Sequence, residues 1–302
     1  MQELLDAVVV GAGHAGLSMS YFLKQAGHSH VVFERGEVGE TWRSQRWDSF
    51  ALNTPNFLNG LPGAAYEGDE PDGFWLRDEL VNFFQQYADR FELPIQTGVT
   101  VTGVEQNSGH FRVQANSKAG EHIQVDARNV VVASGIMQTS VIPAQSRLIP
   151  DNILQLHTAT YRNPESLPQG AVVIVGSGQS GCQIAEDIIG TGRDILLCTS
   201  KVARLARRYR GRDMLDWWVE TGFWNVARDE LEDPAMMKLK QPHISGVGRY
   251  GRSVSLQHLA KQCVTIVGRL IDVVDGALVF DDSARENVLF GDTMSQDRKS
   301  VV

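Results

Sequence analysis

Two glycine-rich fingerprints constrain the fold of this chain more than any other feature. Both have the spacing G-x-G-x-x-G, and each follows a run of β-branched residues. A single match of this kind is weak evidence, because short motifs carry false positives. Two matches, each between a predicted strand and a predicted helix, indicate two dinucleotide-binding sites. Their glycines are Gly11, Gly13 and Gly16 in the first fingerprint and Gly176, Gly178 and Gly181 in the second.

Each glycine of such a fingerprint has its own physical reason. The first lets the chain turn sharply out of the strand, the second lets the backbone approach a pyrophosphate, and the third lets helix and strand pack closely. The pyrophosphate then lies at the helix N-terminus, where free N–H groups and the helix dipole favour negative charge. We therefore predict an α/β, three-layer fold with two Rossmann-like domains that bind FAD or NAD(P). For an isolated match, a purely structural turn remains the alternative.

The first fingerprint opens a complete strand–helix–strand unit. The pattern predicts a strand over 6–10, a helix over 14–25 and a strand over 30–33, with Glu34 at its end. A carboxylate about 20 residues past the glycines can accept both ribose hydroxyls of a dinucleotide, and it repels a 2′-phosphate. Glu34 therefore favours FAD or NAD over NADP, with an ordinary exposed acid at a strand end as the alternative.

The second unit differs at the corresponding position. We predict a strand over 171–175, a helix over 179–189 and a strand over 194–199, which runs into Ser200 and Lys201 with no acid. A hydroxyl and cations at that point suit a 2′-phosphate, so this unit favours NADPH. Arg204 is the other candidate, whereas a solvated basic face is the alternative for the arginines from Arg204 to Arg210.

Composition limits the remaining classes. The chain has 302 residues, with 42% hydrophobic and 21% charged residues, which is typical of a globular protein with two domains. Its net charge of −8 argues against nonspecific nucleic-acid binding. No apolar run approaches the ~18 residues that a membrane span needs. The first strand starts almost at the N-terminus, so we expect no signal peptide and a cytoplasmic location.

The three cysteines, Cys182, Cys198 and Cys263, lie far apart in the sequence. A disulfide reductase that passes electrons from flavin to a dithiol needs two neighbouring cysteines, so the sequence excludes that relay. The spacing also offers no metal-ligand cluster, and we predict no metal site. All three cysteines are interpreted as small buried hydrophobic residues.

Between the fingerprints the sequence predicts a helix over 78–90, strands over 97–104 and 111–115, and a buried strand over 124–133. The proline-bounded stretch 163–170 is interpreted as a linker. The predicted domains are therefore an FAD-binding domain over 1–164 and an NADPH-binding domain over 165–302.

Several further motifs accompany the fingerprints. They are the sequences Gly39-Glu40-Thr41-Trp42-Arg43, Ala133-Ser134-Gly135 and His157-Thr158-Ala159-Thr160-Tyr161. With the two fingerprints and Glu34, they make residues 5 to 280 resemble the class B flavin-dependent monooxygenases, which include flavin-containing monooxygenases, YUCCA-type enzymes and CzcO-like flavoproteins. The family's linker fingerprint is matched at His157 and Tyr161, whereas Asp151 and Ile153 depart from it. This departure favours the CzcO-like and YUCCA-type branch.

The resemblance implies a set of site residues. Asn53 would hydrogen-bond near the reactive edge of the flavin, although a plain Asn/Pro turn is an equally good interpretation. His157 would transfer a proton or, as the favoured alternative, act as a packing residue of a hinge. The residues implied in cofactor binding are Gly11, Gly13, His14, Ala15, Gly16, Glu34, Arg35, Thr41, Trp42, Arg43, Ala133, Ser134, Gly135, Gly176, Gly178, Gln179, Ser180, Gly181, Ser200, Lys201 and Arg204.

In the family, the chain returns from the NADPH domain to the flavin domain and adds a last strand and helix there. Residues 281–302 are polar and show no further strand–Gly–helix unit. The resemblance therefore predicts a chain in which this return segment is missing, with a weakened flavin domain.

The activity that the resemblance implies is an FAD-dependent, NADPH-using monooxygenase, which inserts one oxygen of O2 into a small organic substrate through a C4a-hydroperoxyflavin. The substrate would react at nitrogen, sulfur, a carbonyl or an indole, and no nucleic-acid partner is expected. A homodimer stays open. The alternatives are an NADPH oxidase or reductase without oxygenation, and a non-catalytic nucleotide-binding protein.

Overall fold

The computed structural model describes residues 4–137, 139–231, 242–248 and 251–297. They form two compact units, which we describe separately. Short stretches from the first half of the chain pack with the second unit, so neither unit is one continuous stretch of the sequence. The prediction of an FAD domain over 1–164 and an NADPH domain over 165–302 concerns cofactors and stays a prediction. Unit 1 comprises Met1–Arg46, Phe57–Asp69 and Arg77–Ser140, and unit 2 comprises Trp47–Asn56, Glu70–Leu76 and Val141–Val302.

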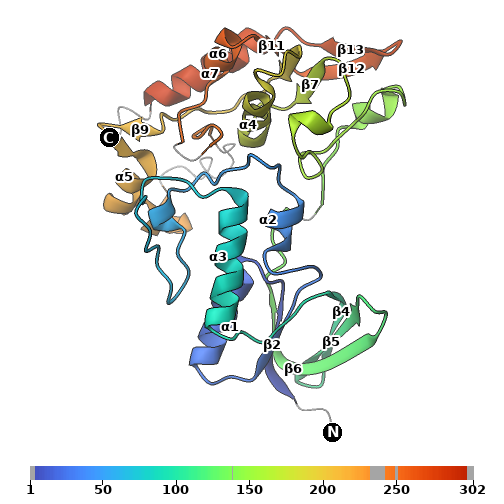
Figure 1. Ribbon diagram of the computed structural model, residues 1–302, viewed down its shortest axis with the longest axis vertical. Coiled ribbons are helices and arrows are strands. Elements are labelled where there is room, and N and C mark those ends of the chain that lie inside the picture. The colour runs from blue at the N-terminus through green and yellow to red at the C-terminus, as the bar shows by residue number, and fades with distance from the viewer. Residues whose placement is uncertain (1–3, 138, 232–241, 249–250, 298–302) are drawn as a thin grey trace. The chain divides into compact units, whose positions relative to one another are not determined.

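A six-stranded mixed sheet in the order β3-β2-β1-β6-β5-β4 forms the centre of unit 1 (Figure 1). The strands from β3 to β6 pair in parallel, whereas β6, β5 and β4 form an antiparallel meander. Parallel β1 and β2 joined through a helix are the βαβ unit predicted from the first fingerprint. The strands are β1 (Leu5–Val10), β2 (His30–Phe33), β3 (Ile95–Gln96), β4 (Val99–Asn107), β5 (His110–Ser117) and β6 (His122–Val132).

Helices α1 (His14–Gln25), α2 (Glu40–Ser44) and α3 (Arg77–Arg90) complete unit 1. The bounds of α1 are those predicted. Helix α3 begins one residue before the predicted start and turns one apolar stripe inward, as its periodicity predicts. The stripe consists of Leu80, Val81, Phe84 and Tyr87, all buried. Burial raises the pKa of Tyr87 to about 12, and its hydroxyl donates to the carbonyl of Pro62 at 2.7 Å.

The prediction that 124–133 is a buried strand is correct for the strand and wrong for part of its burial. Ala127 is fully buried, but Val132 is 73% exposed. Strand β5 pairs with β6 only as far as Ala127, while β1 pairs with β6 up to Val132. The last residues of β6 are therefore a sheet edge within the described part of the chain. The buried core of this sheet comprises Val8, Val31, Phe33, Val99, Val113, Ala115 and Ala127.

Unit 2 contains a parallel three-stranded sheet in the order β11-β8-β7, a hairpin of β12 and β13, and a short β9–β10 ribbon. The second predicted βαβ unit is its centre, because α4 joins the parallel strands β7 and β8. Its strands are β7 (Val172–Val175), β8 (Ile195–Cys198), β9 (Arg208–Tyr209), β10 (Arg212–Asp213), β11 (Val264–Val267), β12 (Leu270–Val274) and β13 (Ala277–Phe280). Its helices are α4 (Gln179–Ile188), α5 (Met214–Glu220), α6 (Leu256–Lys261) and α7 (Ala284–Asp297). The 3-10 helices of the chain are η1 (Asn56–Leu58), η2 (Ala144–Leu148), η3 (Pro164–Ser166), η4 (Phe223–Asn225) and η5 (Arg228–Glu230).

Hydrogen bonds explain why segment 47–56 packs with unit 2. The carboxylate of Asp187 on α4 accepts from the hydroxyls of Ser49 at 2.5 Å and Tyr161 at 2.6 Å. Burial and this carboxylate raise the pKa of Tyr161. The backbone of Leu52 donates to Trp75 at 2.9 Å, which ties segment 70–76 to segment 47–56.

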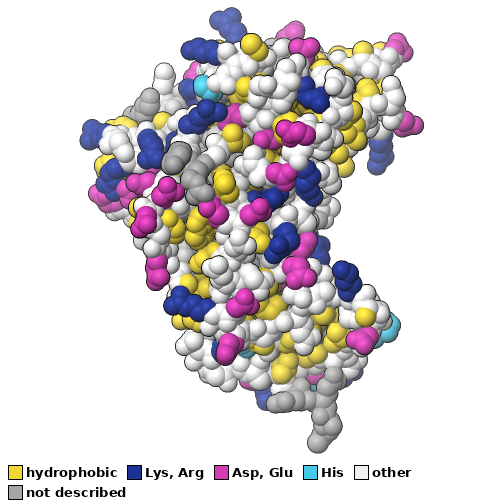
Figure 2. All heavy atoms as spheres, in the orientation of Figure 1, with side chains coloured by type: hydrophobic (Ala, Val, Ile, Leu, Met, Phe, Trp, Pro, Cys, Tyr) yellow, Lys and Arg dark blue, Asp and Glu magenta, His cyan; other side chains and the backbone are white. Residues whose placement is uncertain are grey.

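The polar stretch after Phe280 contains a 14-residue helix, α7, which its composition did not indicate. It is drawn in red in Figure 1. None of the helices in the described part of the chain has the length and apolar character of a membrane span. On the face shown in Figure 2, Lys and Arg side chains are interspersed with Asp and Glu.

Two of the three cysteines are buried, as predicted, and one prediction is wrong. Burial raises the pKa of Cys182 to about 12 and that of Cys198 to about 11, so both thiols stay protonated. Cys263 is exposed. It lies two residues after the end of α6 and has φ +66°, a left-handed backbone conformation that is uncommon for residues other than glycine.

Candidate dinucleotide-binding sites

The first glycine of each fingerprint makes the sharp turn that the motif requires. Gly11 has φ +106° and Gly176 has φ +112°, values that only glycine adopts without strain. A Cβ atom on Gly11 would also lie 2.6 Å from the carbonyl oxygen of Ala133, the residue that follows β6. The first fingerprint is thus packed against the predicted Ala133-Ser134-Gly135 turn, whose Ser134 and Gly135 are exposed.

The third glycines produce the closest approach between helix and turn. A Cβ atom on Gly16 would lie 1.8 Å from the carbonyl oxygen of Gly11, and one on Gly181 would lie 2.0 Å from that of Gly176. No side chain fits at such distances, so both positions require glycine. The two units therefore repeat the close packing of helix against turn that the fingerprint requires.

The second glycines differ, because the space around them is open. A Cβ atom on Gly13 or Gly178 would meet nothing within 4 Å. Both residues are helix N-caps in extended conformation, and neither α1 nor α4 has an acid in its first turn. Uncapped N–H groups beside open space are a preformed site for an anion such as a pyrophosphate. The neighbouring residues His14, Ala15 and Ser180 are exposed beside these turns.

Glu34 follows β2, and its side chain is buried at 7% exposure. Its carboxylate accepts hydrogen bonds from the backbone of Ala12 at 2.8 Å and of Gly36 at 3.0 Å. Glu34 is therefore fixed against the glycine turn, at the carboxyl end of the parallel strands where nucleotides bind in such sheets. The alternative of an ordinary exposed acid is wrong, while its ribose contact stays a prediction.

Of the residues predicted to line the flavin, Thr41, Trp42 and Arg43 lie on α2, and Arg35 lies between β2 and α2. Gly39, with φ +72°, is the N-cap of this helix, and its carbonyl accepts backbone hydrogen bonds from Trp42 and Arg43. The guanidinium of Arg46 lies 5.0 Å from the centre of the Trp42 ring, a cation–π contact. Arg35 and Arg43 are exposed, and Thr41 is half-buried. These side chains belong to unit 1 together with Gly13 and Glu34.

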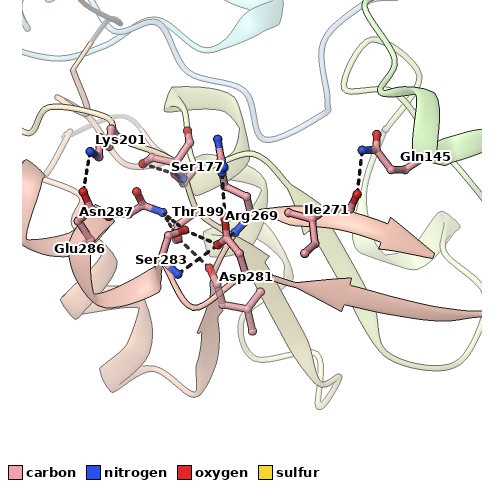
Figure 3. A network of polar contacts seen from close by, with 12 residues as sticks. Gln145, Ser177, Thr199, Lys201, Arg269, Ile271, Asp281, Ser283, Glu286 and Asn287 are labelled. Carbon is pink, nitrogen blue, oxygen red and sulfur yellow. Dashed lines mark hydrogen bonds and ion pairs between the residues drawn. The ribbon is translucent and has the colours of Figure 1, made fainter. Parts of the chain in front are cut away.

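The end of β8 carries the residues predicted to bind a 2′-phosphate. The backbone N–H of Ser200 donates to the hydroxyl of Ser177, inside the second fingerprint, at 3.0 Å. Lys201 and Arg204, however, are ion-paired to α7. The Nζ of Lys201 lies 2.6 Å from Glu286, and the Nη2 of Arg204 bonds to Asp292 (Figure 3 shows the first pair). The predicted cations therefore have carboxylate partners.

A segment that sequence reasoning missed supports the second fingerprint. The Nε2 atom of His243 hydrogen-bonds to the carbonyl oxygen of Ser177, and the thiol of Cys182 lies 3.6 Å from the same nitrogen. Burial lowers the pKa of His243. The side chain of Gln179, a predicted cofactor residue, bonds to the backbone of Ser245 and accepts from Ile244 at 3.1 Å. Since these partners are more than 60 residues away, no local signal announces them.

Asn53, the first predicted catalytic residue, lies in unit 2. Its side-chain oxygen accepts from Gln183 of α4 at 3.3 Å, and its carbonyl accepts from Arg207 at 2.6 Å. Arg207 is paired with Asp213 at 2.7 Å, with both side chains almost completely buried. The sequence did not predict this ion pair. The arginines of this region were interpreted from the sequence as phosphate ligands or as a solvated face.

His157, the second predicted catalytic residue, is half-buried. Its Nδ1 accepts from the backbone of Ala159 at 3.2 Å, and its carbonyl accepts from Thr160 and Tyr161. These contacts stabilise the turn before Tyr161, and both the proton-transfer role and the packing role of His157 stay predictions. Among the described residues, no group of three or more His, Cys, Asp or Glu side chains could hold a metal ion.

The fold and the paired fingerprints define an α/β protein with two Rossmann-like units of the FAD/NAD(P)-binding kind. The family model of pyridine nucleotide-disulphide oxidoreductases matches residues 8–266. The chain belongs to this family, and the predicted resemblance to class B flavin-dependent monooxygenases is confirmed.

Relatives in sequence include bacterial and plant proteins. The chain is 35% identical to an uncharacterized CzcO-like oxidoreductase of Geobacillus kaustophilus. The aligned region covers 75% of this chain and 63% of that relative. The chain is 31% identical to the uncharacterized oxidoreductase CzcO of Bacillus subtilis, covering 93% and 78%. It is 27% identical to the probable indole-3-pyruvate monooxygenase YUCCA9 of Arabidopsis thaliana, covering 60% and 44%. The chain thus spans less than two thirds of the Geobacillus and Arabidopsis proteins.

Solved structures share the fold at low identity. A flavin-containing monooxygenase from Stenotrophomonas maltophilia superimposes with a TM-score of 0.63 at 23% identity, covering 93% of this chain and 77% of that one. A bacillithiol disulfide reductase from Bacillus cereus gives 0.56 at 15% identity, covering 75% and 66%. Both confirm the Rossmann-like fold class predicted from the fingerprints.

Proposed function

We propose that this chain is an FAD-dependent, NADPH-using monooxygenase that transfers one oxygen atom of O2 to a small organic substrate. One observation carries the proposal. Two turns of matching geometry are followed by different strand ends, with the buried Glu34 after β2 and with Ser200 and Lys201 after β8. A carboxylate selects a free ribose, whereas a hydroxyl and a cation suit a phosphorylated one.

FAD fits the first unit. The open space at Gly13 and the uncapped start of α1 would take the pyrophosphate, and Glu34 would accept from the ribose hydroxyls. The guanidinium of Arg43 would balance phosphate charge. A relative named as a probable monooxygenase and a protein of the same fold solved in complex with FAD and NADP support this assignment.

NADPH fits the second unit by the same logic. Gly178 and the start of α4 would take its pyrophosphate, and Ser200, Lys201 and Arg204 would face the 2′-phosphate. A steroid monooxygenase of the same fold is bound to NADP in its solved structure. His243 would keep the turn at Ser177 in shape for the nucleotide.

Together the two cofactors supply hydride transfer and oxygen activation, so the protein's own contribution is positioning and the exclusion of water. Gln183 holds the side-chain amide of Asn53, and Arg207 holds its backbone carbonyl, so the residue is fixed at two points. That rigidity suits a hydrogen-bond donor near a reacting group better than a mobile turn. His157 would act as a packing residue. The substrate would react at nitrogen, sulfur, a carbonyl or an indole.

The test is oxygen-isotope transfer. Purified protein is supplied with FAD, NADPH and ¹⁸O2, and simple sulfides, indole-3-pyruvate and cyclic ketones are offered as substrates. A monooxygenase consumes NADPH and O2 together and leaves one ¹⁸O atom in the product. Glu34→Gln and Lys201→Gln should weaken FAD and NADPH binding respectively, with Glu37→Gln as an exposed control near Glu34.

Two outcomes would overturn the proposal. NADPH and O2 consumption without ¹⁸O in any product would identify an NADPH oxidase or reductase. A protein that binds neither FAD nor NADPH would be a non-catalytic member of the family. Absorbance near 450 nm after addition of FAD and gel filtration separates these two results before any turnover is measured.

A further inference from the structure

Helix α7 lies along the loop that follows β8, where the second unit is proposed to receive the 2′-phosphate of NADPH. The side-chain amide of Asn287 is buried and donates to the hydroxyls of Thr199 at 3.1 Å and Ser283 at 3.0 Å. A Cβ atom on Gly291 would lie 3.2 Å from the carbonyl oxygen of Val202. Figure 3 shows Asn287, Thr199, Lys201 and Glu286 in one network. The helix is therefore in direct contact with residues 199–204.

Two carboxylates of α7 neutralise the cations of that loop. Glu286 pairs with Lys201 at 2.6 Å, and Asp292 pairs with Arg204. The amide of Gln257 on α6 donates to the other oxygen of Asp292 at 2.7 Å, which fixes this carboxylate beside Arg204. The side chains of Lys201 and Glu286 are 55% and 65% exposed, so this pair can open to a competing anion.

The space beside the Arg204–Asp292 pair is open and basic. A pocket of about 480 Å³ is lined there by Arg204, His258 and Lys261, with Ser255, Gln257 and Asp292 among the remaining lining residues. Among the described residues that line it, Asp292 is the one acid. An anion that displaced Asp292 would find the cations Arg204 and Lys261 and the imidazole of His258 around it, so the carboxylate occupies a place that suits a phosphate.

We propose that Glu286 and Asp292 of α7 set the nucleotide preference of the second unit by competing with the 2′-phosphate for Lys201 and Arg204. NADPH has to displace both carboxylates, whereas NADH, which lacks the 2′-phosphate, leaves them in place. The two acids therefore lower the preference of the wild-type chain for NADPH over NADH. This inference rests on the proposed function, because it requires that the second unit bind a nicotinamide dinucleotide.

The experiment compares NADPH and NADH binding to the full-length wild-type chain and to Glu286→Gln/Asp292→Asn by isothermal titration calorimetry. Gln and Asn keep the size and shape of the side chains and remove the charge, while one of the two acceptor oxygens becomes an NH2 group. The double variant should bind NADPH about three- to tenfold tighter, the range expected from two partly exposed ion pairs. Its NADH affinity should change by less than twofold.

A matched control separates local competition from overall charge. Glu165→Gln/Asp229→Asn also removes two exposed acids from unit 2 and should leave the ratio of NADPH to NADH affinity unchanged. Adding Lys201→Gln to the Glu286→Gln variant should cancel the gain for NADPH, as a double-mutant cycle requires for a direct competition. Adenosine 2′,5′-bisphosphate and 5′-AMP repeat the comparison with ligands that differ by the 2′-phosphate.

The measurements distinguish failure of this inference from failure of the proposed function. If the wild type binds NADPH and the double variant binds it no tighter, the role of α7 is overturned and the proposed function stands. An equal gain in the Glu165→Gln/Asp229→Asn control also overturns it. If neither the wild type nor the variants bind either nucleotide, the proposed NADPH site is overturned, and the inference with it.

Discussion

Gly181 and Gly176 are so close that a Cβ atom on Gly181 would lie 2.0 Å from the carbonyl oxygen of Gly176. Gly16 stands in the same relation to Gly11, at 1.8 Å. In both units the first turn of the helix is pressed against the turn that leaves the strand. Such contact brings the N–H groups of the helix to the end of the strand, where a pyrophosphate can reach them.

The glycines of the second fingerprint should separate folding from binding. Gly181→Ala brings a methyl group into steric clash with the backbone carbonyl of Gly176. The clash should lower the free energy of unfolding by about 1–3 kcal/mol. Gly178→Ala has open space and φ −76°, so it should fold normally and weaken NADPH binding instead. Urea unfolding and calorimetric titration measure the two effects. Equal stability losses for both variants would contradict the geometry.

Glu34 should matter for stability even without a cofactor. Glu34→Gln replaces one of the two carboxylate oxygens that accept from Ala12 and Gly36 by an amide NH2 group. A buried backbone N–H then loses its acceptor, which costs about 1–3 kcal/mol. Urea unfolding of the cofactor-free protein measures this, with the exposed Glu37→Gln as the control. A variant as stable as the wild type would show that Glu34 does not hold the turn.

The Arg207–Asp213 pair should be one of the more costly pairs to break. Asp213→Ala leaves the guanidinium of Arg207 buried without its counter-charge, 4.3 Å from the centre of the Phe74 ring. Removing one partner of a buried pair typically costs about 3–5 kcal/mol. Asp216→Ala breaks the exposed pair with Arg212 and should cost about 0–1 kcal/mol. Thermal unfolding of both variants makes the comparison, and similar losses would refute it.

His243 should make the protein less stable in mild acid. Because burial lowers its pKa in the folded chain, unfolding lets the imidazole take up a proton that the folded state disfavours. The free energy of unfolding should therefore fall as the pH drops below about 6.5, by at most ~1.36 kcal/mol per pH unit for this one group. His243→Gln should lose that part of the slope between pH 6.5 and 5. Identical slopes for wild type and variant would exclude His243 as the cause.

The cysteines should react very unequally. Cys182 and Cys198 are buried with raised pKa values, whereas Cys263 is exposed. A thiol reagent such as Ellman's reagent should titrate one thiol rapidly in the native protein and three after denaturation. Cys263→Ser should abolish the rapid phase. Two rapid thiols in the native protein would reopen the dithiol relay that the cysteine spacing excludes.

Local patterns were sufficient to predict both βαβ units. The bounds of α1 and β2 are as predicted, and α4 ends one residue before its predicted end, because glycine turns and apolar periodicity act over a few residues. The same local patterns place the acid Glu34 after the second strand of the first unit, and Ser200 and Lys201, which are not acidic, after the second strand of the second unit. These residues account for the class of cofactor expected in each unit.

Contacts between distant parts of the chain were not predictable in this way. His243 beside Ser177, Gln183 beside Asn53, and α7 beside Lys201 each join segments more than 60 residues apart in the sequence. Their partners carry no periodic signal, since one buried histidine or one exposed glutamate fits many environments. The sequence by itself determined two nucleotide turns and the chemistry at the end of each second strand. Tertiary packing alone decided which carboxylates reach the cations of the second unit, because ion pairs form between side chains that only the folded chain brings within reach.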